Sequence, residues 1–324
     1  MSDKDLRLVQ NMYFNQSASI KHNGKVSGQV PIKRGVRQGD SPSPDYFSLY
    51  SEMIMREIDG EEGVKINGIN VNNLRLADDI VLMALSEKAL QNLLDLINRK
   101  GEKFGMEINF KKTKCMVCSK LTDQTVTIHL NDQPLKTVDS FKYLGSLLTS
   151  DCKSRCDIRQ NVAKAKKAFS DMKSVLANLK MPMKLRLRIL RCYIEPILLY
   201  SSETWTLMTA DKKTLMATEM WFLRRMLKIK WTDKVTNEEV LRRAGTRRWM
   251  MNTIAKRQTS FFGHIIRKQG LENLAMTGKI LGRKSRGRRR RQYLDQIKEW
   301  TGIQQTEVLL REANTRNLQT VNVH

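Results

Sequence analysis

The sequence predicts an α+β fold in which strands and packed helices fill the first 150 residues and a mainly helical region follows. Short apolar runs flanked by turn residues recur as far as Leu148, which is typical of strands. Apolar residues three and four positions apart recur between these runs, and beyond residue 150 this helical spacing dominates. We therefore expect three regions, over residues 1–150, 151–200 and 201–324.

Composition points to a polyanionic partner. The 324 residues carry a net charge of +25, with a pI near 10.0 and a hydrophobic fraction of 40%. Nucleic acid fits this charge better than a membrane does, because no long apolar span is present. No apolar segment follows Met1, so we expect an intracellular protein of the nucleus or cytoplasm.

The five cysteines do not form a recognisable framework. Their number is odd, and Cys115 and Cys118 have a spacing typical of zinc sites but no second such pair follows. We expect buried, reduced thiols.

The chain is organised around residues 74–83, where two apolar runs flank Asp78 and Asp79. The pattern predicts a β-hairpin with both carboxylates at its tip. Adjacent carboxylates repel each other unless a cation lies between them, and hard oxygen ligands suit Mg²⁺. This arrangement is typical of two-metal phosphoryl transfer. An isolated Asp-Asp pair is far more often an exposed polar turn than a metal site, so the interpretation depends on the surrounding motifs.

Other elements of the first region follow from local patterns. We expect a helix from Asp5 leading into a loop by Ile20, a strand over 26–33, and a helix capped by Ser86. Further strands are predicted over 106–110, up to 117, 126–130 and 141–148. A helix after the Gly- and Pro-containing loop 34–44 should pack through an apolar stripe made of Tyr46, Leu49, Tyr50, Met53, Ile54 and Ile58.

The spacing of apolar residues predicts helices for the rest of the chain. One spans 158–179, a second over 185–200 is disturbed by Pro196, and two more lie near 215–228 and 249–266. Between these, Thr236 opens a short helix with a capping box that closes near Gly245. A basic run over 283–291 precedes a last helix with Tyr293, Leu294, Ile297 and Trp300 on one side.

Four motifs in this order resemble the reverse transcriptases of non-long-terminal-repeat (LINE-type) retrotransposons, and within them the RTE-like lineage. They are Gly35–Pro44, Leu76–Asp79, Phe104–Lys114 and Phe141–Gly145. These correspond to the family's Arg-Gln-Gly motif, its Ala-Asp-Asp metal hairpin, its Gly-x-x-Ile-Asn…Lys-Thr-Lys segment and its primer grip. The resemblance is good over residues 6–150 and softer over 151–300, where 229–237 and 263–267 also look like the family's post-polymerase region.

The resemblance implies an RNA-directed DNA polymerase that uses an RNA template, a DNA primer and deoxynucleoside triphosphates, with a palm, a helical thumb and a basic helical C-terminal region. Asp78 would bind catalytic Mg²⁺, or Mn²⁺ in its place, and Asp79 would assist. The other implied site residues are Arg37, Gln38 and Gly39 at the nucleotide and template, Lys112 at the triphosphate, and Tyr143, Leu144 and Gly145 at the primer end. Nucleic-acid contacts would come from Lys164, Lys166 and Lys167 on the thumb and from Arg288, Arg289, Arg290 and Arg291.

The chain departs from the family in two places. Leu76 replaces the usual Phe or Tyr of the metal hairpin. The family also places a further metal-binding aspartate on an earlier strand, beside the hairpin, and only Asp3 and Asp5 precede the matching region here. We expect an upstream segment to complete the site and the chain alone to be inactive. The alternatives are a non-catalytic or domesticated nucleic-acid-binding remnant, and a fragment that folds poorly.

Overall fold

The computed structural model describes residues 3–33, 35–58, 60–119, 126–268, 270–278, 291–315 and 317–321. The chain divides into two compact units. The first comprises residues 1–64, 70–110 and 129–132, and the second comprises 65–69, 111–128 and 133–324. Both contain helices, and the described strands are short and form two-stranded sheets, which confirms the α+β fold class. The three-region division stays a proposal.

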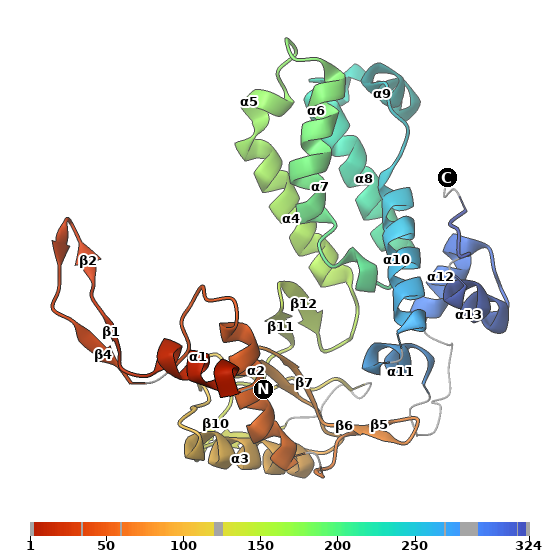
Figure 1. The fold of residues 1–324 in the computed structure, drawn as a ribbon. Coiled ribbons are helices and arrows are strands. Elements are labelled where there is room, and N and C mark those ends of the chain that lie inside the picture. The colour runs from red at the N-terminus through yellow and green to blue at the C-terminus, as the bar shows by residue number, and fades with distance from the viewer. Residues whose placement is uncertain are drawn as a thin grey trace. The chain divides into compact units, whose positions relative to one another are not determined.

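The described residues of the first unit form three α-helices, a 3₁₀ turn and most of the strands. Their bounds are α1 (Asp3–Tyr13), β1 (Gln16–Ala18), β2 (Lys21–His22), β3 (Lys25–Val26), β4 (Val30–Ile32), α2 (Ser43–Met55), η1 (Arg56–Ile58), β7 (Asn73–Leu76), β8 (Asp79–Leu82), α3 (Glu87–Lys103) and β9 (His129–Leu130). Strands β5 (Val64–Ile66) and β6 (Ile69–Val71) lie where the chain passes between units. Figure 1 shows β1 to β4 as a long antiparallel ribbon.

The core of the first unit lies between α2 and α3. Met55, Ile58 and Ile97 are buried together, with Leu82 and Ile108 packed against them. Helix α3 begins as predicted, because the Ser86 side chain accepts a hydrogen bond from the Ala89 amide at 3.2 Å.

The predicted apolar stripe of α2 is only partly a core. Ile54 and Ile58 are buried, but Leu49, Tyr50 and Met53 are exposed. Tyr50 is held at the surface, where its hydroxyl donates to the Phe104 carbonyl. The prediction of a helix here is confirmed, and the prediction that its whole apolar stripe packs within this unit is wrong.

Two strand predictions also change. Residues 106–117 form no ladder: in this described stretch the pairing is one parallel bridge between Cys115 and Thr137. Residues 141–148 form a hairpin rather than one strand, since the chain reverses at Leu144 and Gly145. Leu144-Gly145 supplies the two positive-φ residues that a tight hairpin turn requires.

The second unit is mainly helical. Its elements are β10 (Gln133–Pro134), β11 (Ser140–Tyr143), β12 (Ser146–Thr149), α4 (Arg155–Asp171), α5 (Lys173–Leu176), α6 (Met183–Ile189), η2 (Leu190–Ile194), α7 (Glu195–Leu198), η3 (Ser202–Thr204), α8 (Thr209–Met226), η4 (Trp231–Asp233), α9 (Asn237–Ala244), α10 (Met250–Arg267), α11 (Leu271–Thr277), α12 (Tyr293–Thr301) and α13 (Thr306–Asn314). Helices α6 and α7 follow one another through η2, and this run and α8 both pack against α4, while α10 packs against α8, α12 and α13 (Figure 1).

One continuous core joins these helices. It runs from Ile158 on α4 to Ala313 on α13 and includes the fully buried Trp300. The helix predicted over 158–179 breaks at Met172, where α4 ends and α5 starts. Pro196 disturbs its helix as expected: it has no N–H to donate, and a π-helical turn precedes it, in which Glu195 N–H donates to the Leu190 carbonyl.

Candidate active site and nucleic-acid surface

The Asp-Asp pair lies at the tip of a hairpin, as predicted. Strands β7 and β8 are antiparallel, and Asp79 lies opposite Leu76. Ala77 and Asp78 make the two-residue turn, and Ala77 takes a left-handed φ of 53°. The two carboxylates are adjacent in the chain and exposed, so both are available to a ligand.

One face of this hairpin is anchored to the first unit. Leu82 packs on the core between α2 and α3. Arg75, two pairs along on the same face, makes a 2.8 Å ion pair with Glu52 of α2. The hydrogen bond and charge of Arg75 lower the pKa of Glu52. These contacts fix the hairpin relative to α2.

The opposite face carries Asp79 and is open. Because cross-strand partners share a face, Asp79 lies on the side of Leu74 and Leu76 rather than of Arg75. Leu74 is 37% exposed and Leu76 is 56% exposed. Apolar side chains therefore flank the carboxylate in solvent, where another part of a folded protein could pack.

Asp78 and Asp79 fit a hard divalent cation in their chemistry. Mg²⁺ is usually held by one or two carboxylates and completes its shell with water and substrate phosphates. Within the described ranges, no group of three or more His, Cys, Asp or Glu side chains comes together. The pair is the candidate ligand set that the hairpin itself provides.

The predicted nucleotide-binding residues lie on the loop between β4 and α2. Arg37, Gln38 and Gly39 are all exposed, and Arg37 Nε donates to the Gln16 side chain at 3.1 Å. Gly39 has a φ of 96°, and a Cβ there would meet no neighbouring atom. The glycine is required by the turn of the backbone and leaves open space above the loop. Lys112 lies in an exposed turn of the second unit.

The predicted primer-grip residues form one rigid turn. Leu144 and Gly145 have φ angles of 47° and 85°. The Tyr200 hydroxyl donates to the Leu144 carbonyl at 2.7 Å, and a Cβ on Gly145 would lie 2.9 Å from the Tyr200 ring. Glycine is therefore needed here for both conformation and space, because Tyr200 packs directly against the turn.

Three residues that support this turn escaped sequence reasoning: Tyr200, Asp157 and Trp205. Asp157 Oδ1 accepts from the Leu147 amide at 2.8 Å, and its Oδ2 accepts from Trp205 Nε1 at 2.9 Å. One feature of the sequence could have pointed to Asp157: it directly precedes Ile158, which begins the apolar face of the predicted helix. Such an acid needs partners, but sequence does not say which.

The three predicted thumb lysines of α4 have different environments. Lys164 Nζ donates to the Gln160 and Asn161 side chains, at 3.0 and 3.4 Å. Lys166 Nζ lies 5.2 Å from the centre of the Trp221 ring. Lys167 is exposed. Of the three, Lys167 is the one whose surroundings most favour an external anion.

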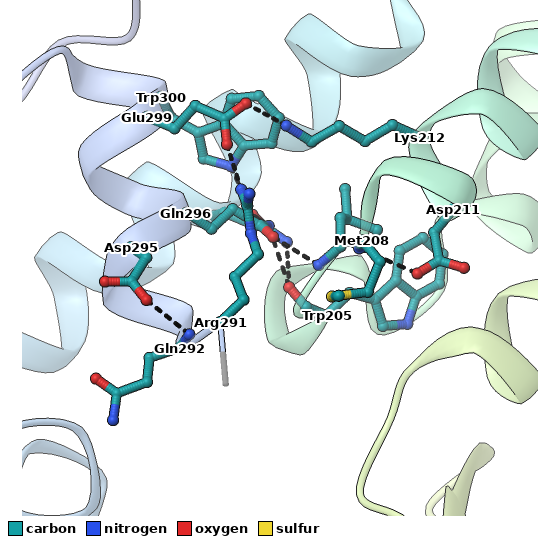
Figure 2. A network of polar contacts seen from close by, with 12 residues as sticks. Trp205, Met208, Asp211, Lys212, Arg291, Gln292, Asp295, Gln296, Glu299 and Trp300 are labelled. Atoms are coloured by element: carbon teal, nitrogen blue, oxygen red, sulfur yellow. Dashed lines mark hydrogen bonds and ion pairs between the residues drawn. The ribbon is translucent and has the colours of Figure 1, made fainter. Parts of the chain in front are cut away.

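The basic run is described only at its end. Arg288, Arg289 and Arg290 lie outside the described residues. Arg291 forms an ion pair with Glu299, which also pairs with Lys212 (Figure 2). The contribution of the four arginines, 288–291, to nucleic-acid binding stays a prediction.

Arg291 thus joins a polar network around α12. Lys212 Nζ lies 4.5 Å from the centre of the Trp300 ring. Beside it, Gln296 donates to the Trp205 carbonyl at 3.1 Å and accepts from the Leu207 amide at 2.6 Å (Figure 2). The network connects α12 to the start of α8.

The cysteine prediction is wrong in one respect. All five cysteines are free, but only Cys115 is buried, while Cys118, Cys152, Cys156 and Cys192 are exposed. Desolvation and the neighbouring Cys152 thiol raise the pKa of Cys118 to about 11.

Comparison with known proteins finds similar sequences. The family model described as reverse transcriptase (RNA-dependent DNA polymerase) matches residues 2–148, which include the Asp-Asp hairpin and the turn at Leu144. The chain is also similar to the Pol polyprotein from the type-2 retrotransposable element R2DM of Drosophila melanogaster. The two are 31% identical over 165 residues, which is 48% of this chain and 15% of that polyprotein.

Two further relatives come from other animals. A transposon-derived protein of Caenorhabditis elegans, F52C9.6, is 28% identical over 212 residues, covering 64% of this chain and 75% of the relative. An R2 Pol polyprotein of Bradysia coprophila is 28% identical over 152 residues, covering 44% of this chain and 17% of its own length. These matches are consistent with a non-LTR retrotransposon reverse transcriptase. The RTE-like lineage stays a prediction.

The chain spans a small part of the R2 polyproteins that it matches. In the part of the chain that the structure describes, no helix is both long and apolar enough to cross a bilayer.

Proposed function

We propose that this chain carries the metal hairpin of an RNA-directed DNA polymerase and acts on an RNA template, a DNA primer and deoxynucleoside triphosphates in the nucleus or cytoplasm. The observation that carries the proposal is the Asp78–Asp79 tip, exposed on a hairpin that Leu82 and Arg75 anchor to the unit beneath. A bound Mg²⁺ or Mn²⁺ would supply charge neutralisation at the reacting phosphate.

The protein residues divide the work. Asp78 and Asp79 would hold the metal and, through it, orient the triphosphate. Gly39 leaves the backbone of its loop open to close approach, and Arg37 and Gln38 beside it would contact nucleotide and template.

Two other positions complete this assignment. A cationic Lys112 would neutralise charge on the leaving pyrophosphate. The turn Tyr143–Gly145, held by Tyr200, would fix the primer end.

We further propose that an upstream segment completes the site. Asp79 shares its strand face with the exposed Leu74 and Leu76, which is the surface that such a segment would cover. By resemblance, that segment supplies the additional metal-binding aspartate. The chain alone should then bind a metal loosely and extend no primer.

A primer-extension assay on an RNA template tests the proposal. Extension should require the upstream segment in trans, should depend on Mg²⁺ and should be lost in Asp78→Asn. Asp45→Asn, which changes an exposed acid on α2, is the matched control and should keep activity. Extension by the chain alone would contradict the need for a completing segment. No extension by the complete mixture would contradict the polymerase assignment.

The net charge of +25 favours a second candidate, a non-catalytic or domesticated nucleic-acid-binding protein. Nucleic-acid binding with a steep salt dependence, together with no extension under any combination of segments, would support this candidate over the first.

A further inference from the structure

Trp231 stands apart from the other four tryptophans. It is 89% exposed, whereas Trp205 and Trp300 are buried in the helical core. The remaining two, Trp221 and Trp249, each pack against a cation: Arg225 lies 4.8 Å from one ring centre and Arg191 lies 4.9 Å from the other. The exposed indole leaves a large, flat apolar surface available for stacking with a partner.

The loop that presents Trp231 is well fastened. Within the 3₁₀ turn η4, Asp233 accepts from the Lys230 amide at 2.7 Å, and the Lys234 amide donates to the Trp231 carbonyl at 3.3 Å. Lys228 and Lys234 at its two ends take left-handed φ angles of 57° and 47°. Non-glycine residues rarely adopt this backbone conformation unless the surrounding structure holds it. The loop that carries Trp231 therefore has a defined conformation.

Arg224 of α8 ties this loop to the helices. Its Nη2 donates to the Val235 carbonyl at 2.8 Å and to Asn237 Oδ1 at 3.0 Å. Arg224 and Asn237 also line an open pocket of about 460 Å³, which Lys213 and Arg248 line as well. Arg224 therefore links the segment after this loop to a pocket lined by three cationic side chains.

The charge around Trp231 is strongly positive. Residues 228–234 contain three lysines, at 228, 230 and 234, and all three are exposed. The single acid among them, Asp233, is engaged by the Lys230 amide. A protruding aromatic ring among lysines matches the chemistry of an unpaired nucleobase with its flanking phosphates, since bases stack on indole while lysines neutralise the backbone.

We propose that Trp231 stacks on an unpaired base of single-stranded nucleic acid, RNA or DNA, with Lys228, Lys230 and Lys234 taking the adjacent phosphates. This contact lies outside the family's polymerase motifs. The proposal rests on the proposed binding of nucleic acid, but it does not require polymerisation.

Equilibrium binding of the full chain to a labelled 20-nucleotide single strand and to a matched duplex provides the test. Trp231→Ala should weaken single-strand binding about 5- to 150-fold, while Trp231→Phe should keep most of the affinity, because a phenyl ring still stacks. Duplex binding should change little. The unfolding midpoint should be unaltered in both variants, because the side chain is 89% exposed.

Salt dependence separates the tryptophan from the lysines. Trp231→Ala should leave the slope of log affinity against log salt unchanged. The triple variant Lys228→Gln/Lys230→Gln/Lys234→Gln should reduce it by about 0.7 for each lost phosphate contact on a single strand. The same triple change at the exposed Lys173, Lys180 and Lys184 is the matched control for lost charge.

The proposal would be overturned if Trp231→Ala bound the single strand with wild-type affinity. It would also be overturned if the Ala and Phe variants lost the same amount of affinity. Loss of binding to anionic vesicles instead of to oligonucleotides would also overturn it and assign the loop to a membrane surface. The result is independent of catalysis, since Asp78→Asn should abolish extension by the completed enzyme and leave single-strand binding intact.

Discussion

Asp157 and Trp205 are joined by a hydrogen bond in which the indole Nε1 donates to Asp157 Oδ2 at 2.9 Å. Both residues are 2% exposed, and the other carboxyl oxygen of Asp157 accepts from the Leu147 amide of β12. One side chain therefore ties the predicted primer-grip hairpin to the core of the helical unit. A catalytic grip needs such support, because a loosely held turn positions nothing.

Removing this side chain should destabilise the second unit. Asp157→Ala leaves the Trp205 and Leu147 donors without acceptors, and each costs about 1–3 kcal/mol, so the free energy of unfolding should fall by about 2–6 kcal/mol. Asp157→Asn retains one acceptor oxygen and should cost less. Urea denaturation measures both, with Asp171→Ala at the exposed end of α4 as the control. Equal stability of Asp157→Ala and the control would contradict this account.

Gly145→Ala should be destabilising for two separable reasons. A left-handed φ costs a Cβ-bearing residue about 1–2 kcal/mol, and contact with the Tyr200 ring adds about 1–3 kcal/mol. Gly245→Ala, at a φ of 62° with open space around it, carries only the first cost. In a Tyr200→Ala background the penalty at Gly145 should shrink toward that of Gly245. An unchanged penalty would show that the ring does not press on the turn.

Glu219 should make the stability depend on pH. It is fully buried, its Oε1 accepts from the Trp249 and Met250 amides at 2.8 and 3.0 Å, and burial raises its pKa. The folded protein then holds this proton more tightly than the unfolded chain. The resulting stability is full below the unfolded value of about 4.3 and is lost as pH rises through the folded pKa.

Glu219→Gln cannot ionise and keeps an acceptor for both amides. Its free energy of unfolding relative to wild type should therefore rise between pH 5 and pH 8, measured by urea denaturation at each pH. Glu238→Gln, which removes an exposed acid on α9, is the control for the loss of one carboxylate. Parallel pH profiles for wild type and Glu219→Gln would mean that Glu219 titrates as it does in the unfolded chain.

Local chemistry made parts of this structure predictable. The Asp-Asp hairpin follows from alternating apolar residues on both sides of a two-residue turn. Thr236 accepts from the Glu239 amide at 3.3 Å and Gly245 closes α9 with a φ of 62°, as their residue types predict. These signals act over four residues and need no tertiary partner.

Long-range contacts explain what the sequence could not supply. Asparagine is a residue type typical of turns, yet the Asn72 side chain is buried and donates to the Ile58 carbonyl at 2.9 Å. The segment after Phe104 has the residues of a strand but finds no ladder, and Lys166 reads as a phosphate ligand but packs on Trp221. Each outcome depends on a neighbour distant in sequence, which a single chain's periodicity does not reveal.

The open face of the Asp-Asp hairpin should make the chain self-associate. Leu74 and Leu76 are exposed on strand β7, and within the described residues β7 and β8 pair only with each other. Exposed apolar strands with unpaired edge groups recruit further strands. Sedimentation velocity over a range of concentrations should therefore show reversible oligomers, and the upstream palm segment added in trans should compete with them.

The variant Leu74→Thr/Leu76→Thr keeps strand propensity and removes the apolar surface. At about 1 kcal/mol for each half-buried leucine, self-association should weaken about 10- to 30-fold. Leu179→Thr, which changes an exposed leucine of the second unit, is the control and should behave as wild type. Two results would show that this face does not mediate self-association. One is a wild-type chain that stays monomeric at every concentration, and the other is a double variant that associates as strongly as wild type. In that case a completing segment would have to dock elsewhere on the hairpin.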